Sequence, residues 1–151
     1  MHFSSIPGRR FLLTMVLAIA GMSFAEAVEF PKQSIRVNTN WIKVEIAQTP
    51  PQLEKGLMGR SVLPLHNGML FVFSKEEHQV MWMKNTQIAL DIAFFDSKGN
   101  LTEQHSGIVP CYRDPCPIYK SGLPARYLLE LPAGSVHLYQ WEVGKTQLKL
   151  R

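Results

Sequence analysis

The sequence lacks most of the features that point directly to a function. Its 151 residues include two cysteines, and they contain no internal repeat, low-complexity tract or linker. Neither Ser61 nor Ser121 stands in the strained strand-to-helix turn of a nucleophile elbow. The histidines have no triad or metal-ligand spacing: they include His66, His78, His105 and His137. We therefore expect a binding or structural protein in preference to an enzyme.

The charge is only mildly basic. The whole chain carries a formal charge of +4, and removing Arg9, Arg10 and Glu26 with an amino-terminal segment leaves 4 − 2 + 1 = +3. Lys and Arg are scattered instead of forming the stripe that nucleic-acid binding requires. No nucleic-acid partner is expected.

The one long apolar run, residues 11–21, is about half the ~20 residues that span a bilayer. It follows Arg9 and Arg10 and precedes small residues at Ala25 and Ala27, which is the pattern of an export signal. We expect cleavage after Ala27, with Ala25 as the alternative. Residues 1–27 are then a cleaved signal peptide, and residues 28–151 form a single periplasmic or secreted domain with no membrane attachment.

The two cysteines, Cys111 and Cys116, lie in a proline-rich segment beyond this signal. An even number of cysteines in an exported protein favours a disulfide. Their C-x4-C spacing differs from that of thioredoxin-type redox sites, so a structural role is expected.

Strand patterns dominate the rest of the chain. Ile42, Val44 and Ile46 alternate with charged residues, which is typical of a half-buried strand. Further strands are expected at residues 68–73, 79–83, 90–95, 101–109, 126–131 and 146–150.

Two short helices are also predicted. Thr49 is a candidate N-cap before Pro50, with Gln52 completing a capping box and glycines ending the helix. Residues 135–144 suggest a second helix closed by a glycine. Because these helices look too short for crossovers, the expected fold is mainly β (β-rich α+β), a jelly-roll-like sandwich or partly open barrel.

Polar residues in apolar surroundings suggest a ligand site. Arg60 follows two glycines, where backbone N–H groups could be left free. Strand alternation places Trp82, Lys84 and Thr86 on one face. Asp91 lies in an apolar strand, opposite in direction to Ile92, and needs water or a cation such as Lys84, Arg60 or Arg126.

Several segments together resemble the domain of unknown function 192 family of small prokaryotic proteins. They are GLMGR (56–60), GMLFVF (68–73), MWMKNT (81–86), LDIAFFD (90–96), the paired PC and CP segments (110–117) and PARYLLELPAG (124–134). The resemblance extends over about residues 41–150. It implies a single β-rich, jelly-roll-like domain but little about activity. Its polar motif positions correspond to Gly59 and Arg60, residues 82–86, Asp91 and Arg126.

The function favoured by these residues is binding of a small polar or anionic ligand. The candidate ligand-binding residues are Arg60, Trp82, Lys84, Asn85, Thr86, Asp91 and Arg126. The alternatives are a structural or partner-binding envelope protein, an enzyme that uses Asp91 and Lys84, and Cu(I) binding through His78, Met81 and Met83. No cofactor is expected, and the protein is expected to be a monomer.

Overall fold

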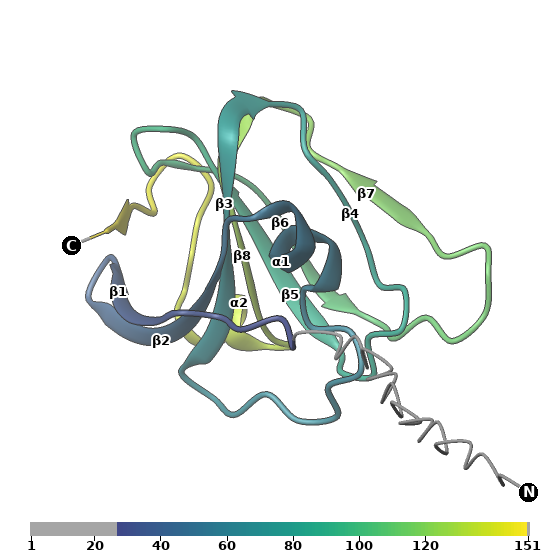
Figure 1. The fold of residues 1–151 in the computed structure, drawn as a ribbon. Helices are drawn as coiled ribbons and strands as arrows, with labels where there is room; N and C mark the ends of the chain where they lie inside the picture. Colours follow the sequence, from purple (N-terminus) through teal and green to yellow (C-terminus); the bar gives the residue numbers. More distant parts are fainter. Residues whose placement is uncertain (1–26, 151) are drawn as a thin grey trace, which may run out of the picture.

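The computed structural model describes residues 27–150, which form nine strands and two short helices (Figure 1). The predicted signal peptide therefore lies outside the described residues except for Ala27. The strands are β1 (Lys32–Val37), β2 (Asn40–Ala47), β3 (Asn67–Glu77), β4 (Val80–Trp82), β5 (Leu90–Phe95), β6 (Leu101–Ile108), β7 (Ile118–Lys120), β8 (Ala125–Pro132) and β9 (Leu148–Lys149). The helices are α1 (Pro50–Lys55) and α2 (Ser135–Leu138).

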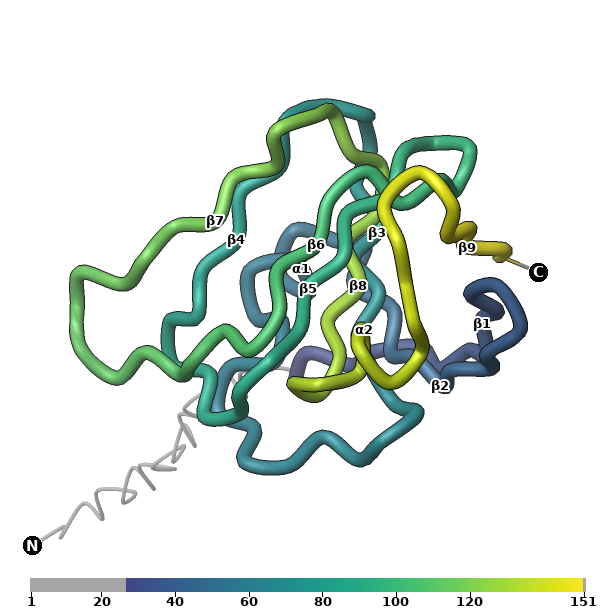
Figure 2. Tube along the Cα trace, turned by 180° about the vertical axis from the view of Figure 1, so that it is seen from behind, coloured from purple at the N-terminus to yellow at the C-terminus, as the bar shows by residue number. Residues whose placement is uncertain are grey.

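Seven strands form one curled sheet in the order β6-β5-β8-β3-β2-β1-β9. Its pairs are antiparallel except β2 and β3, which are parallel and are joined through α1. The remaining strands, β4 and β7, form a separate ribbon that stands beside the main sheet (Figures 1 and 2). The predicted mainly β, partly open architecture is confirmed.

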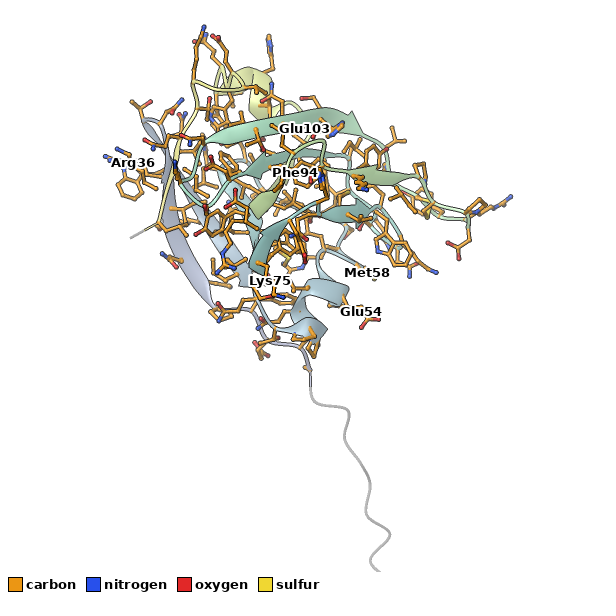
Figure 3. The ribbon with its side chains drawn as sticks, turned by 90° about the horizontal axis from the view of Figure 1, so that it is seen from above. Arg36, Glu54, Met58, Lys75, Phe94 and Glu103 are labelled. Carbon is orange, nitrogen blue, oxygen red and sulfur yellow. A yellow bond between two sulfur atoms is a disulfide. The ribbon has the colours of Figure 1, made fainter. Side chains whose placement is uncertain are left out.

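Strand β5 is buried on both faces of the main sheet, whereas β1 is buried on only one. Successive side chains of a strand point to opposite faces. In β5, Ala93 and Phe95 pack on one side with Trp141, whereas Ile92 and Phe94 pack on the other. Phe94 is fully buried and lies in the interior in Figure 3. The second face is the one covered by α1 and by the β4–β7 ribbon.

Local sequence determines where α1 begins and ends. The Thr49 N–H donates to the Gln52 Oε1 at 3.1 Å, as expected for the capping-box glutamine, and the helix starts at Pro50. Gly56 ends it with a φ of 43°, in the positive-φ region that favours glycine. The predicted second helix is shorter than expected, since α2 stops at Leu138 and turns continue to Gly144.

The sequence also predicted a disulfide, which the structure contains, but it missed two strands. Cys111 and Cys116 form the predicted disulfide, with Cα atoms 5.8 Å apart. The sequence patterns did not reveal β1 or the three-residue β7. Within residues 27–150, no helix has the length and apolar character needed to cross a membrane.

Candidate functional site

A pocket of about 160 Å³ lies between α1, β3, β4 and the central strand β8. We call it the Glu130 pocket. In Figure 1, α1 lies in front of the sheet between β3 and β4, and in Figure 3 Glu54 and Met58 lie near one another at the edge of the molecule. Its lining residues are Leu53, Glu54, Lys55, Gly56, Leu57, Met58, Phe71, Phe73, Val80, Met81, Trp82, Thr86, Leu128 and Glu130.

Glu130 is the buried polar group of this pocket. It lies in β8 between Met69 of β3 and Ile92 of β5, and only 5% of its surface is exposed. Among residues 27–150, no side-chain hydrogen bond or ion pair involves its carboxyl group. Burial raises the pKa of Glu130 from 4.5 to about 8, because desolvation disfavours the charged form. The carboxyl group is therefore mostly protonated at neutral pH.

Five of the fourteen residues that line this pocket are aromatic or sulfur-containing. Phe71 and Phe73 come from β3, Met81 and Trp82 from β4, and Met58 from the turn after α1. Thr86 adds a hydroxyl group from a side chain that is 5% exposed. The pocket therefore combines polarizable apolar surface with two polar groups, which is the usual composition of a small-molecule site.

Two irregular segments hold the mouth of the pocket in place. The Gly59 N–H donates to the Asn85 carbonyl at 2.8 Å, which joins the turn after α1 to the segment after β4. Gly59 and Asn85 both have positive φ, 78° and 55°. Asn tolerates this left-handed conformation better than most residues do. The two segments are GLMGR and MWMKNT, so the sequence motifs meet through their backbones.

Backbone geometry corrects two expectations for these motifs. The Arg60 N–H bonds to the Leu57 carbonyl and the Gly59 N–H to Asn85, so the amides near Arg60 are not free to bind a ligand. Strand alternation also fails after β4, since the turn at Asn85 leaves Thr86 buried and Asn85 exposed. Trp82 and Thr86 nevertheless line the same pocket.

Arg60 is directed to a different place. Its Nη1 donates to Glu45 Oε1 at 3.0 Å, and its Nη2 donates to Glu45 Oε2. It lines a hollow of about 390 Å³ with Lys32 and Lys43, outside the Glu130 pocket. Both of its terminal nitrogens are already engaged by one carboxylate.

Lys84 and Asp91 do not meet, contrary to the expected pairing. Lys84 Nζ binds Asp114 Oδ2 at 3.0 Å and lies 5.3 Å from the Trp82 ring centroid. Asp91 is fully buried, and its two oxygens accept from the Gly107 N–H at 2.8 Å and the Val136 N–H at 2.9 Å. Asp91 thus joins β5 to β6 and α2 through backbone bonds, which replace the cation expected from sequence.

The other candidates are also separate. Arg126 is half-buried near the start of β8 and does not line the pocket. Met81 and Met83 share a face, as predicted, and it is the buried one, while His78 Nδ1 lies 2.9 Å from the Ser121 carbonyl. In the part of the chain from 27 to 150, no three His, Cys, Asp or Glu residues are grouped as a metal site. Copper binding stays a prediction.

Glu130 was not among the candidate ligand-binding residues predicted from the sequence. A signal was present, because Glu130 is the one charged residue in the apolar run from Leu128 to Leu131. An acid in such a strand must find a partner, protonate or face a cavity. The isolated acid becomes informative only once β8 is known to lie in the centre of the sheet. That position depends on pairing with strands distant in the sequence, which a local pattern does not show.

The half-barrel sheet, the accessory ribbon and the pocket between them define a class of small β-rich domain. The chain belongs to the domain of unknown function 192 family, described as "Uncharacterized ACR", whose model matches residues 33–147. No curated protein matches the chain.

Two crystal structures have the same fold. One is titled a "putative transcription regulator" and comes from Sinorhizobium meliloti 1021. Its sequence is 35% identical to this chain, and the two structures superpose with a TM-score of 0.76. The match covers 82% of this chain and 97% of that chain. The other, a protein of unknown function from Novosphingobium aromaticivorans DSM 12444, is 24% identical with a TM-score of 0.75, over 85% of this chain and 94% of that one.

Proposed function

We propose that this protein is an exported binding domain for a small polar molecule, which it holds in the Glu130 pocket. The observation that carries the proposal is the buried carboxyl group of Glu130, which lines a cavity without a hydrogen-bond partner among the described residues. A buried polar group normally has a hydrogen-bond partner. The pocket gives a ligand access to the Glu130 carboxyl group, so the ligand can supply that partner.

The geometry favours this pocket over the sites expected from sequence. The Arg60 guanidinium is satisfied by Glu45, and the carboxylate of Asp91 is satisfied by two backbone N–H groups. Glu130 has no such partner, and Thr86 lines the same cavity. Because the Arg60 guanidinium is already paired and the pocket contains an acid, a polar ligand is better supported than an anionic one.

The size of the cavity limits the ligand. An apolar cavity of about 150 Å³ holds one benzene molecule. A pocket of about 160 Å³ therefore takes a ligand portion of similar size, unless the ligand extends past Trp82 and Met58 to solvent.

Export rests on the amino-terminal sequence pattern, and the disulfide between Cys111 and Cys116 is compatible with it. The ligand would then be a molecule that occurs outside the cytoplasm.

A blocking substitution with a matched control tests the proposed site. Val80 lines the pocket and is 56% exposed, whereas Ile118 is 66% exposed on the neighbouring strand and does not line it. We expect Val80→Trp to narrow the mouth and Ile118→Trp to leave it open. A fragment screen by NMR should give hits that bind wild type and Ile118→Trp and lose at least about tenfold in affinity for Val80→Trp.

Two results would count against the proposal. One is the absence of any fragment that perturbs the Trp82 indole or the Thr86 amide. The other is equal binding to wild type and Val80→Trp, which would place the bound fragments elsewhere on the surface.

A further inference from the structure

We propose that the ligand of the Glu130 pocket is a small primary ammonium compound, whose charged group pairs with the Glu130 carboxylate between the aromatic walls. This inference rests on the proposed function, because it names the chemical class of ligand for the same pocket. It is carried by the composition of the lining, in which Glu130 and Thr86 are the buried polar residues and Phe71, Phe73 and Trp82 are aromatic.

The acid supplies the first part of the recognition. Ionised Glu130 has no cationic partner among the described residues, so a ligand cation would be its first counter-charge. A charge-assisted hydrogen bond from N–H to a carboxylate is about twice as strong as a neutral one. A primary ammonium group has three N–H donors, and Thr86, whose side chain carries a hydroxyl group, lines the same pocket as Glu130.

The aromatic walls supply the second part. Phe71, Phe73 and Trp82 line the pocket, and a cation over an aromatic ring is attracted by the electrons of its face. Trp82 already has such a contact, with the Lys84 ammonium 5.3 Å from the ring centroid. The sulfur atoms of Met58 and Met81 complete a polarizable surface around the short apolar part of the ligand.

The charged groups near Glu130 are few. Glu54 and Lys55 of α1 line the pocket and are exposed, so their opposite charges compensate at its mouth. The residues that β3, β4 and β5 place against Glu130 are apolar, among them Met69, Phe71, Met81 and Ile92. Along β8 itself the nearest charged residue is Arg126, which is half-buried and does not line the pocket.

This arrangement predicts the pH dependence of binding. An alkylammonium ion, with a pKa of about 10.4 as in lysine, stays charged between pH 6 and 9. Glu130, with a pKa of about 8 in the free protein, must lose its proton to pair with it. Affinity for the ammonium ion should therefore rise about tenfold per pH unit below pH 8 and level off above it.

The experiment compares three probes of similar size by 15N NMR titration of the full mature protein. They are n-butylammonium, 1-butanol and butyrate, and the signals read are the Trp82 indole and the Thr86 amide, with the Trp41 and Trp141 indoles as distant references. We expect n-butylammonium to bind more tightly than either other probe at pH 8, with affinity increasing from pH 6. Neither 1-butanol nor butyrate should bind more tightly as the pH rises.

Substitutions identify the counter-charge. Glu130→Gln keeps the size of the side chain, removes its charge, and should weaken n-butylammonium binding at least about tenfold at pH 8 while changing 1-butanol binding less than about twofold. Glu76→Gln removes an exposed acid that does not line the pocket and should leave the titration unchanged. Loss of binding in Glu54→Gln with full retention in Glu130→Gln would overturn the inference.

The outcomes separate this inference from the function on which it rests. Binding of 1-butanol or butyrate in preference to n-butylammonium would overturn the ammonium class and leave a small-molecule pocket in place. If none of the three probes shifts the Trp82 and Thr86 signals, the ammonium class is overturned, and the fragment screen with Val80→Trp decides separately whether the pocket binds another small polar molecule.

Discussion

Asp91 and Glu130 are buried acids on adjacent strands, and they differ in their hydrogen bonding. Asp91 lies opposite Leu131, and Glu130 lies opposite Ile92, so the two carboxyl groups point to opposite faces of the sheet. Asp91 accepts two backbone N–H bonds, whereas Glu130 faces a cavity. We infer that Asp91 stabilises the fold and that Glu130 is available to a ligand.

For Asp91, we predict that Asp91→Asn lowers the free energy of unfolding by about 2–4 kcal/mol, because an amide replaces a charged acceptor of two buried N–H groups. Asp114→Asn is the matched control, since Asp114 forms an exposed pair with Lys84 and should cost less than about 1 kcal/mol. Urea unfolding measures both. Equal losses would mean that the backbone bonds to Asp91 contribute little to stability.

For Glu130, we predict a pH-dependent difference in stability between wild type and Glu130→Gln. The pKa of about 8 in the folded protein exceeds the ordinary glutamate pKa of 4.5, so between these pH values the folded state binds more protons than the unfolded state. Wild-type stability should therefore fall as pH rises from about 5 to 8, by about 1 kcal/mol per pH unit from this group. Glu130→Gln lacks this contribution, so the difference between the two proteins should grow towards pH 8.

Urea unfolding at several pH values checks the sign. A difference that stays constant from pH 5 to 8 would show that Glu130 has an ordinary pKa in the folded protein. At the residue scale, sequence reasoning identified Asp91 as a charge that needed a partner, but it could not show that the partners are distant backbone groups.

At the scale of elements, most strands were predictable because their apolar residues alternate or form short runs bounded by turns. β1 was missed since only Ile35 and Val37 are buried within a polar stretch. β7 was missed because it has three residues and lies in a proline-rich segment. Both are recognised only through their partners, β2 and β4, which a sequence pattern does not specify.

The turn between β5 and β6 meets β9 at Gly99, and this contact leads to a prediction about packing. A Cβ atom at Gly99 would lie 2.2 Å from the Leu148 carbonyl oxygen, and its φ is 83°. Gly144 has a similar φ of 78° but no atom within 4 Å of a Cβ. We expect Gly144→Ala to cost about 1–2 kcal/mol for the left-handed backbone alone.

Gly99→Ala should cost more, about 3 kcal/mol or above, because β9 must move away from the turn. Thermal or urea unfolding of the two variants measures the difference. Similar losses of unfolding free energy in Gly99→Ala and Gly144→Ala would show that β9 moves away from a Cβ at residue 99 without cost. The left-handed backbone would then account for both losses.

At the scale of the whole molecule, the sequence indicated the fold class correctly but did not bring the candidate site together. Arg60, Trp82 and Asp91 were predicted to form one polar site because each lies in a motif that resembles the family, in apolar surroundings. In the folded protein Arg60 pairs with Glu45 beside a different cavity. Trp82 lines the Glu130 pocket, and Asp91 lies in the core. The GLMGR and MWMKNT motifs meet through a backbone hydrogen bond from the Gly59 N–H to the Asn85 carbonyl. The chemistry of the side chains does not predict such a bond.

We also predict that the mature protein begins at Val28 and is found outside the cytoplasm. The reason is the basic, apolar and small-residue pattern of residues 9–27. Amino-terminal sequencing of protein from the cell-envelope fraction measures this. Replacing Ala25 and Ala27 together by Lys should prevent cleavage, whereas an intact Met1 form of the wild type in the cytosol would contradict the prediction.

The central position of β8 has a consequence for the order in which the chain folds. β8 is near the carboxyl end of the sequence, yet it separates β5 from β3 in the sheet. A chain emerging from the ribosome cannot join the two halves of this sheet until residues 125–132 have been synthesised. Such non-local pairing slows folding to about milliseconds or seconds. The core of the sheet therefore cannot close until β8 has left the ribosome and paired with both β3 and β5.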